Sequence, residues 1–181
     1  MANDFAKAFK RILAFFQEHS IMYVLIGAWP TSYWGQPRST EDIDFLILLS
    51  PDELKNLRSH AQNSSHFKID TQWDEHNPMI RHQHLRLLFK DIHLDLSISK
   101  NSHESEIIKR RLKVPLDDFE IYMATAEDII LMKLLAGRPK DFQDAISIFV
   151  KQQNQLNHDY LRAWAKALSI YDELNWLYIQ N

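Results

Sequence analysis

Two short apolar runs lie on either side of a polar segment, and this arrangement limits the folds that the chain can adopt. Residues 21–26 are rich in β-branched and aromatic side chains and end at Gly27, and residues 42–49 form a second run. Short apolar runs bounded by turn residues are typical of buried strands. Between them, Pro30 fits the first turn of a short helix ending near Trp34, because that turn leaves backbone N–H groups unbonded. This part of the chain therefore predicts strands that alternate with helices.

The remaining pattern continues this alternation and then becomes helical. Ser50 and Thr125 are suitable helix N-caps, and Asp128 occupies the reciprocal place of a capping box after Thr125. Residues 70–84 read as a polar loop. The expected helices cover residues 4–19, 51–62, 104–112, 125–136, 141–152, 159–168 and 171–178, and the further expected strands cover residues 67–69, 85–89, 92–98 and 120–123. We predict an α/β core in residues 1–120 and a C-terminal helical region, residues 121–181, packed on it in one compact unit.

Composition narrows the class of protein. The chain has 181 residues, of which 45% are hydrophobic, so it can bury a core of its own. Its formal net charge of -3 argues against extensive coating of nucleic acid, and the lack of cysteine excludes disulfides, thiolate metal sites and a cysteine nucleophile. No apolar run approaches the ~20 residues of a bilayer span, and the N-terminus lacks the apolar stretch of a signal peptide. We expect a cytoplasmic protein without a membrane partner.

Asp42 and Asp44 interrupt the start of the second apolar run. Because side chains alternate along a strand, both carboxylates project to one face, about 7 Å apart, while Ile43 packs on the other face. Two such acids repel each other unless a cation lies between them, and oxygen ligands of this kind favour magnesium or manganese. The alternative is a solvated strand end whose acids only cap a loop.

Asp95 is the third acid of interest. It lies in residues 92–98, which we expect to form a hairpin with residues 85–89. If this strand lies beside the one that carries Asp42 and Asp44, three carboxylates converge, as they do in two-metal sites for phosphoryl transfer. A single aspartate on an edge strand is common, so Asp95 by itself predicts little.

Gly27 lies where the first strand turns into the short helix. A glycine at such a turn lets the backbone approach a phosphate closely, and the N-terminus of the helix that follows offers free N–H groups. A phosphate bound here would lie near any metal held by the aspartates. Glycine also occurs in many turns that bind nothing.

Taken together, these residues resemble the nucleotidyltransferase superfamily of the DNA polymerase β type. The shared pattern is a strand, a glycine turn, a short helix, two aspartates one residue apart on the next strand, and a third aspartate on a later strand. The matching residues are Gly27, Asp42, Asp44 and Asp95. The stretch RSTEDID, from Arg38 to Asp44, is similar to a form found in small bacterial members. Ala28 departs from the pattern, where glycine or serine is usual: it keeps the backbone N–H but has no hydroxyl.

A second block, residues 125–146, is similar to the C-terminal helices of a bacterial branch that includes abortive-infection toxin nucleotidyltransferases. In that branch a helical lysine contacts nucleotide phosphates, and the resemblance gives this role to Lys133, with help from a neighbouring basic side chain. Asp141 and Asp144 lie three residues apart on one helical face and could orient the base. The alternative is an ordinary amphipathic helix pair with surface ion pairs. The assisting basic side chain is Arg138 or Lys140.

The resemblance implies a small mixed β-sheet flanked by helices, with a C-terminal helical layer. It also implies metal-dependent transfer of a nucleoside monophosphate from an NTP to an acceptor, with pyrophosphate released. Gly27, Ala28 and Arg38 would contact the phosphates, and Asp95 would be the candidate base for the acceptor. The residues that would hold Mg²⁺ or Mn²⁺ are Asp42, Asp44 and Asp95.

The sequence leaves the acceptor open. A small molecule such as an antibiotic, a protein side chain and an RNA 3′ end, as used by a toxin, all fit the pattern. One alternative class is a catalytically weak or inactive member that binds nucleotide or a partner protein such as a cognate antitoxin. Another is a purely structural α/β module in which the acids are solvated.

Overall fold

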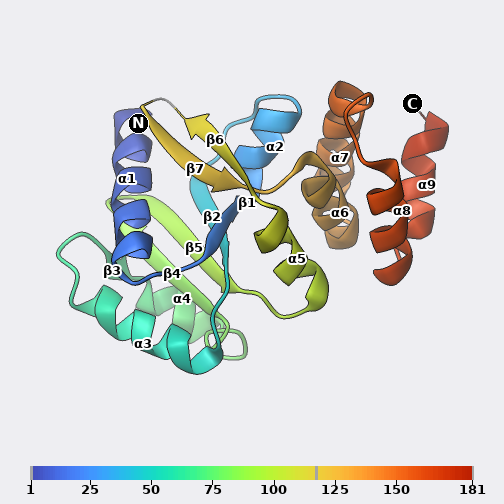
Figure 1. The fold of residues 1–181 in the computed structure, drawn as a ribbon. Helices are drawn as coiled ribbons and strands as arrows, with labels where there is room; N and C mark the ends of the chain where they lie inside the picture. Colours follow the sequence, from blue (N-terminus) through green and yellow to red (C-terminus); the bar gives the residue numbers. More distant parts are fainter. Residues whose placement is uncertain (1, 117, 181) are drawn as a thin grey trace.

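The computed structural model describes residues 2–116 and 118–180. Its strands are β1 (Tyr23–Ile26), β2 (Asp42–Ile47), β3 (Lys68–Ile69), β4 (His84–Phe89), β5 (Ile92–Ile98), β6 (Leu112–Leu116) and β7 (Phe119–Met123). They form one seven-stranded sheet in the order β3-β4-β5-β2-β1-β7-β6 (Figure 1). β2 pairs with β5, and β1 with β7, in parallel, whereas the other neighbours are antiparallel. The predicted mixed sheet is therefore confirmed.

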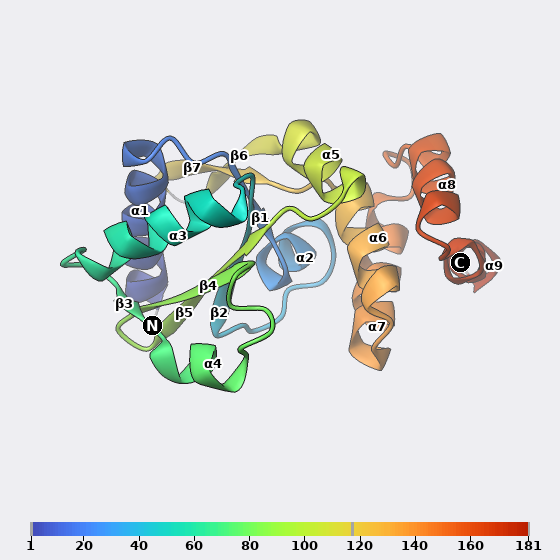
Figure 2. The ribbon, with the colours of Figure 1, turned by 90° about the horizontal axis from the view of Figure 1, so that it is seen from below.

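Helices cover both faces of this sheet. They are α1 (Ala2–Glu18), α2 (Ala28–Trp34), α3 (Pro51–Gln62), α4 (Thr71–His76), α5 (Ser102–Arg110), α6 (Ala126–Ala136), α7 (Pro139–Gln152), α8 (His158–Ala167) and α9 (Tyr171–Gln180). Figures 1 and 2 show α1 and α3 on one side of the sheet and the block from α6 to α9 on the other. This arrangement confirms the predicted α/β (α+β) class with a C-terminal helical layer.

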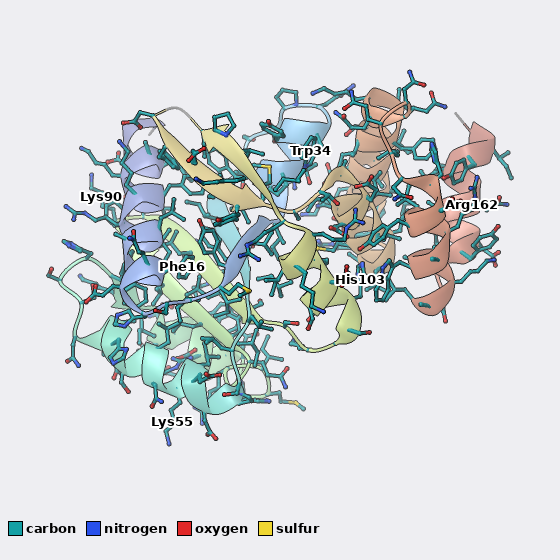
Figure 3. All side chains as sticks on the ribbon, in the orientation of Figure 1. Phe16, Trp34, Lys55, Lys90, His103 and Arg162 are labelled. Atoms are coloured by element: carbon teal, nitrogen blue, oxygen red, sulfur yellow. The ribbon has the colours of Figure 1, made fainter. Side chains whose placement is uncertain are left out.

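The alternation of side chains in β2 divides the hydrophobic core into two clusters. Phe45 is fully buried on the side of α1, where its ring packs edge-on against that of Phe16, which is labelled in Figure 3, with centroids 5.1 Å apart. Leu46 is buried on the opposite side, in the cluster formed with α6 to α9. Because residues two apart share a face, Asp42 and Asp44 lie on the Leu46 side. The core thus fixes the face to which both aspartates point.

Two helix N-caps predicted from the sequence differ in detail. Ser50 and Glu53 form a complete capping box at the start of α3, where the Ser50 N–H lies 2.7 Å from Glu53 Oε2. Thr125 caps α6 by accepting a hydrogen bond from the Asp128 N–H. The expected reciprocal hydrogen bond, from the Thr125 N–H to the Asp128 side chain, does not form, so the predicted capping box was wrong in this half. Asp128 Oδ2 accepts its hydrogen bond from the Thr125 hydroxyl, 2.8 Å away, and not from the Thr125 N–H. Aspartate is one methylene shorter than the glutamate usual in this place.

Two further expectations about secondary structure were wrong. The polar loop contains α4, whose first turn is capped by Asp70; no residue of α4 is buried, so the sequence shows no apolar periodicity there. The helix expected to reach Leu112 ends at Arg110, and Leu112 begins β6. β6 contains Pro115, which cannot donate to a neighbouring strand, and this is tolerated because β6 lies at the edge of the sheet.

The proposed division of the chain after residue 120 stays a prediction. That boundary lies within β7, which pairs with both β1 and β6. The C-terminal helices share a hydrophobic cluster with Val24 of β1 and Leu46 of β2. None of the helices in the described part of the chain has the length and apolar character that a bilayer span requires.

Candidate active site

Three aspartates come together on one face of the central strands. β5 lies directly beside β2 in parallel register, with Asp95 opposite Asp44 and His93 opposite Asp42. Residues paired in this way point to the same face, so the neighbouring strands required for convergence of the carboxylates are present. His93 Nδ1 lies 3.0 Å from Asp42 Oδ1, which holds the more exposed of the two β2 carboxylates in place.

The Asp44 carboxylate rests against the backbone of Gly27. A Cβ atom added to Gly27 would lie 2.1 Å from Asp44 Oδ2, and Gly27 has φ +75°, which L side chains rarely adopt. Burial and the negative charges of Asp95 and Asp42 raise the pKa of Asp44 to about 6. Asp44 is therefore a carboxylate whose negative charge is poorly compensated by the protein and which a cation would stabilise.

Gly27→Ala is expected to lower the free energy of unfolding by about 2 to 3 kcal/mol, since both the strained φ and the displaced Asp44 carboxylate oppose alanine. Chemical denaturation would measure the loss. Gly137→Ala is the matched control: Gly137 also has a positive φ, 69°, but a Cβ there meets its nearest atom only at 3.9 Å, so about 1 kcal/mol is expected. Equal losses in the two variants would show that Asp44 does not press on Gly27.

Asp95 is bound by basic side chains of the neighbouring strand β4. Arg86 donates from Nε to Asp95 Oδ1 at 2.7 Å and from Nη2 to Oδ2 at 2.8 Å, and His84 Nε2 lies 2.8 Å from Oδ1. Burial alone would raise the pKa of Asp95, but the hydrogen bonds from His84 and Arg86 outweigh it, and the pKa is lowered. Trp73 of α4 packs on both partners, with its ring centroid 4.3 Å from that of His84.

A cavity of about 580 Å³ opens beside Gly27, between the sheet and α6. Its lining includes the predicted site residues except Asp95 and Asp144, which lie outside it. Sequence reasoning missed the apolar wall from α6 and most of the loop before β2. The predicted lining residues are Gly27, Ala28, Arg38, Asp42, Asp44, Lys133, Arg138, Lys140 and Asp141, and the others are Ile26, Ser39, Thr40, Glu41, Ile129, Met132 and Ala136.

Three of the four basic side chains of the cavity are held by two acids of α7. Lys133 Nζ lies 3.0 Å from Asp141 Oδ1 and 2.8 Å from Asp144 Oδ2. Arg138 also binds the fully buried Asp141, and Arg38 Nη2 lies 3.4 Å from Asp144 Oδ2. Burial alone would raise the pKa of Asp141, but hydrogen bonds from Arg138 and Lys133 lower it. The two helices and the turn between them therefore join Lys133 and Arg138 to Asp141 and Asp144 in one partly buried ion-pair network, which is more than a set of surface pairs.

A family model described as a nucleotidyltransferase of unknown function (DUF6036) matches residues 4–179. The chain belongs to this family of nucleotidyltransferases. The superfamily resemblance in the sequence is thus confirmed, and the protein is a transferase enzyme. No curated protein sequence matches the chain significantly.

Solved structures share the fold of this nucleotidyltransferase at low sequence identity. The antibiotic-resistance factor ANT(2'')-Ia has a TM-score of 0.60 and 14% identity, with 100% of each chain covered. An antigenic nucleotidyltransferase-like protein from Paracoccidioides brasiliensis has a TM-score of 0.54 and 18% identity, with 90% of this chain and 86% of that chain covered. The lincosamide antibiotic adenylyltransferase LnuA, bound to lincomycin, has a TM-score of 0.51 and 17% identity, with 78% of this chain and 94% of that chain covered.

The donor set of the nucleotidyltransferase site suits a divalent cation that arrives with its substrate. In the residues that the structure describes, no group of three or more His, Asp or Glu side chains is arranged to hold a metal ion. Magnesium, however, is usually bound by one or two carboxylates together with substrate phosphates, and not by an all-protein cage. Asp42 and Asp44 both line the cavity and would be the two carboxylates for such an ion. A cation bound beside Asp44 would offset the burial and the negative charges that raise the pKa of this carboxyl.

Proposed function

We propose that this nucleotidyltransferase moves a nucleoside monophosphate from an NTP to a hydroxyl of a small molecule in a metal-dependent reaction. The observation that carries the proposal is the division of charge in the cavity: Asp42 and Asp44 lie on the sheet, and four cations, two of them paired with Asp141, line the same space. A metal–triphosphate complex has the complementary pattern, positive at the metal and negative at the phosphates. The four cations are Arg38, Lys133, Arg138 and Lys140.

Different residues of the cavity bind the metal and the phosphates in this proposal. Asp42 and Asp44 would hold Mg²⁺ or Mn²⁺, which, when bound, neutralises charge on the transferred phosphoryl group and the leaving pyrophosphate. The backbone of Gly27 and Ala28 borders the phosphates, and Ala28 still offers its N–H. Lys133 and Arg38 contact the β- and γ-phosphates, whose negative charge they pair equally before and during transfer.

Asp95 was predicted to be a third metal ligand and the base for the acceptor. In the structure its oxygens accept hydrogen bonds from Arg86 and His84. Its predicted role would therefore require one of these donors to be exchanged for the metal or the acceptor. Asp42 and Asp44 make no contact of this kind with arginine, and for this reason they carry the metal in the proposal.

The nucleobase and the acceptor occupy different surroundings in this proposal. Ile129, Met132 and Ala136 recur on one face of α6 and give the cavity an apolar wall against which a base can lie. The choice of a small-molecule acceptor draws on the fold neighbours, since two of them are named for antibiotics. Protein and RNA acceptors, the latter as in a toxin, are the competing outcomes of the test.

Calorimetric titration with each NTP tests the nucleotide site. We expect saturable binding in Mg²⁺ that weakens by about tenfold or more in EDTA, because metal and triphosphate share the site. Incubation with α-labelled NTP and separate pools of aminoglycosides, lincosamides, cell protein and total RNA then identifies the acceptor. No binding of any NTP would refute the proposal, and label found only on RNA or protein would refute the small-molecule acceptor.

A catalytically weak member that binds nucleotide or a partner protein, such as a cognate antitoxin, is the second candidate. It is favoured by Ala28, which lacks a hydroxyl at the phosphate turn, and by the engagement of Asp95 with Arg86. Ala28→Ser separates the two candidates, because it restores the missing hydroxyl without adding bulk. A rise in label transfer from a barely detectable level would favour the second candidate, whereas robust transfer by the unmodified protein would exclude it.

A further inference from the structure

Helix α7 holds the loop that carries Arg38 to the cavity. The loop follows α2, covers residues 35–41, and provides Arg38, Ser39, Thr40 and Glu41 to the cavity wall. Figure 3 labels Trp34 at the end of α2, beside the block formed by α6 and α7. Four side chains along α7 reach this loop or Trp34, the residue before it. The contacts are Asp144 to Arg38 (3.4 Å), Ser147 Oγ to the Gln36 N–H (3.4 Å), Lys151 Nζ to the Gly35 carbonyl (2.9 Å) and Gln152 Nε2 to the Trp34 carbonyl (2.8 Å).

At Gly35 the backbone of this loop lies against α7 without space for a side chain. A Cβ atom added to Gly35 would lie 2.4 Å from Ser147 Oγ and 3.0 Å from Ile148 Cγ1. The start of the loop is therefore fixed by packing and by hydrogen bonds to its backbone. The Arg38 side chain, which is about a third exposed, is not fixed by these backbone contacts; its charged end is paired with Asp144.

Asp144 differs from the other acid of the network, Asp141. Asp141 lines the cavity and binds Lys133 and Arg138, both from the end of α6 and the turn after it. Asp144 lies behind the cavity wall, with its side chain 12% exposed, and its Oδ2 reaches Lys133 Nζ at 2.8 Å and Arg38 Nη2 at 3.4 Å. These are ion-pair distances without the alignment of a hydrogen bond. Asp144 is thus the group that joins the Arg38 loop to α6.

We infer that Asp144 is a positioning residue that orients Arg38 and Lys133 toward the triphosphate. The inference rests on the proposed function of the cavity. Long basic side chains lose rotamer freedom when they bind phosphate, and a preformed ion pair removes part of that cost before the ligand arrives. The negative charge of Asp144 acts in the opposite direction, because it competes with phosphate for both cations. Lys133 keeps Asp141 as a partner whether or not Asp144 is charged. The net effect of Asp144 on triphosphate affinity is therefore decided by how it orients Arg38.

Asp144→Asn tests this inference, because it keeps the size of the side chain and removes its charge. Titration with a non-hydrolysable NTP analogue and Mn²⁺ is expected to give a Kd about 10-fold higher, as two side chains lose their orientation. The KM for NTP should rise in parallel, while kcat stays within about threefold because the carboxylates of β2 are untouched. Asp159→Asn is the matched control: its acid lies in an exposed ion pair with Arg162, far along the chain in α8, and no change is expected.

A double-mutant cycle with Arg38→Met separates positioning from general damage. If Asp144 acts through Arg38, adding Asp144→Asn to Arg38→Met weakens binding by about threefold or less, well below its effect alone. Asp144→Glu keeps the charge and should stay within about threefold of the unmodified Kd, which protects the test if the asparagine variant does not fold. Three results would each overturn the inference. The Kd of Asp144→Asn could be unchanged or lower, the effects of Asp144→Asn and Arg38→Met on Kd could multiply as if independent, or Asp144→Glu could lose affinity tenfold. Failure of the unmodified protein to bind any NTP would instead overturn the proposed function, and the inference with it.

Discussion

Asp44→Asn is expected to reduce nucleotide transfer by about 10³-fold or more. Asp44 lines the cavity beside Gly27, and in the proposed function it holds the divalent cation. Charge stabilisation by a catalytic metal amounts to several kcal/mol, and each 1.36 kcal/mol corresponds to about a factor of ten in rate. Asparagine keeps the shape but loses the charge. Rates of label transfer from NTP, measured at saturating Mg²⁺ and Mn²⁺, would show the loss; transfer within tenfold of the unmodified rate would exclude Asp44 as a metal ligand.

The same substitution is expected to stabilise the protein when metal is absent. The pKa of Asp44 is raised from 3.8 to about 6 in the folded state, so the folded protein binds the proton more tightly than the unfolded chain does. Stability therefore falls as pH rises from about 4 to about 6, and above this window the ionised Asp44 costs about 2 to 3 kcal/mol. Urea denaturation in EDTA should show a gain for Asp44→Asn at pH 8 that disappears at pH 4. A loss of stability at pH 8 would contradict the raised pKa.

Asp42→Asn is the matched control for this pair of effects. The Asp42 side chain is 45% exposed and has His93 as a partner. Its substitution should also lower nucleotide transfer, since it removes the other proposed metal ligand. It should not stabilise the metal-free protein, because the Asp42 carboxylate is partly exposed and already has His93 as a partner. Stabilisation by both variants would show that general repulsion between carboxylates, and not the burial of Asp44, sets the energy of the site.

The residues that could be read from the sequence are those whose roles follow from local spacing. Asp42 and Asp44 are two apart, so the alternation of a strand places them on one face whatever the rest of the fold is. Gly27 closes an apolar run and must turn the chain. Lys133 and Asp141 were placed by resemblance, and the α6–α7 pair brings them within 3.0 Å of each other. In each of these cases the signal lies within a few residues or within a recognised block.

The contacts that were missed depend on pairing between distant segments. Arg86 was not recognised as the partner of Asp95, although the two-residue turn at Lys90 and Asp91 sets the hairpin register and places them opposite each other. That register could have been counted from the sequence. The support that α7 gives to the Arg38 loop could not have been predicted from the sequence, because it joins residues more than 100 positions apart through tertiary packing.

Arg86→Met is expected to lower the free energy of unfolding at pH 7 by about 3 kcal/mol. The Asp95 side chain is only 8% exposed, and Arg86 supplies two of its hydrogen bonds, so methionine would leave a buried charge with His84 alone. Breaking a buried ion pair by removing one partner costs about 3 to 5 kcal/mol, and the 23% exposure of Arg86 places the cost at the lower end. Chemical denaturation would measure this loss.

Two comparisons show whether the loss comes from the unpaired carboxylate. Arg86→Met combined with Asp95→Asn should recover much of the stability, because a neutral amide tolerates burial better than an isolated charge. The pKa of Asp95 is lowered from 3.8 in the folded protein. The stability that Arg86 provides is therefore fully present above pH 3.8 and is lost as pH falls through the lower, folded-state pKa. In acid the variant should approach the stability of the unmodified protein. Lys113→Met, which breaks an exposed pair with Glu120, should cost less than about 1 kcal/mol. If Arg86→Met cost no more than that, Asp95 would be free to exchange its partner, and its predicted role as a metal ligand would gain support.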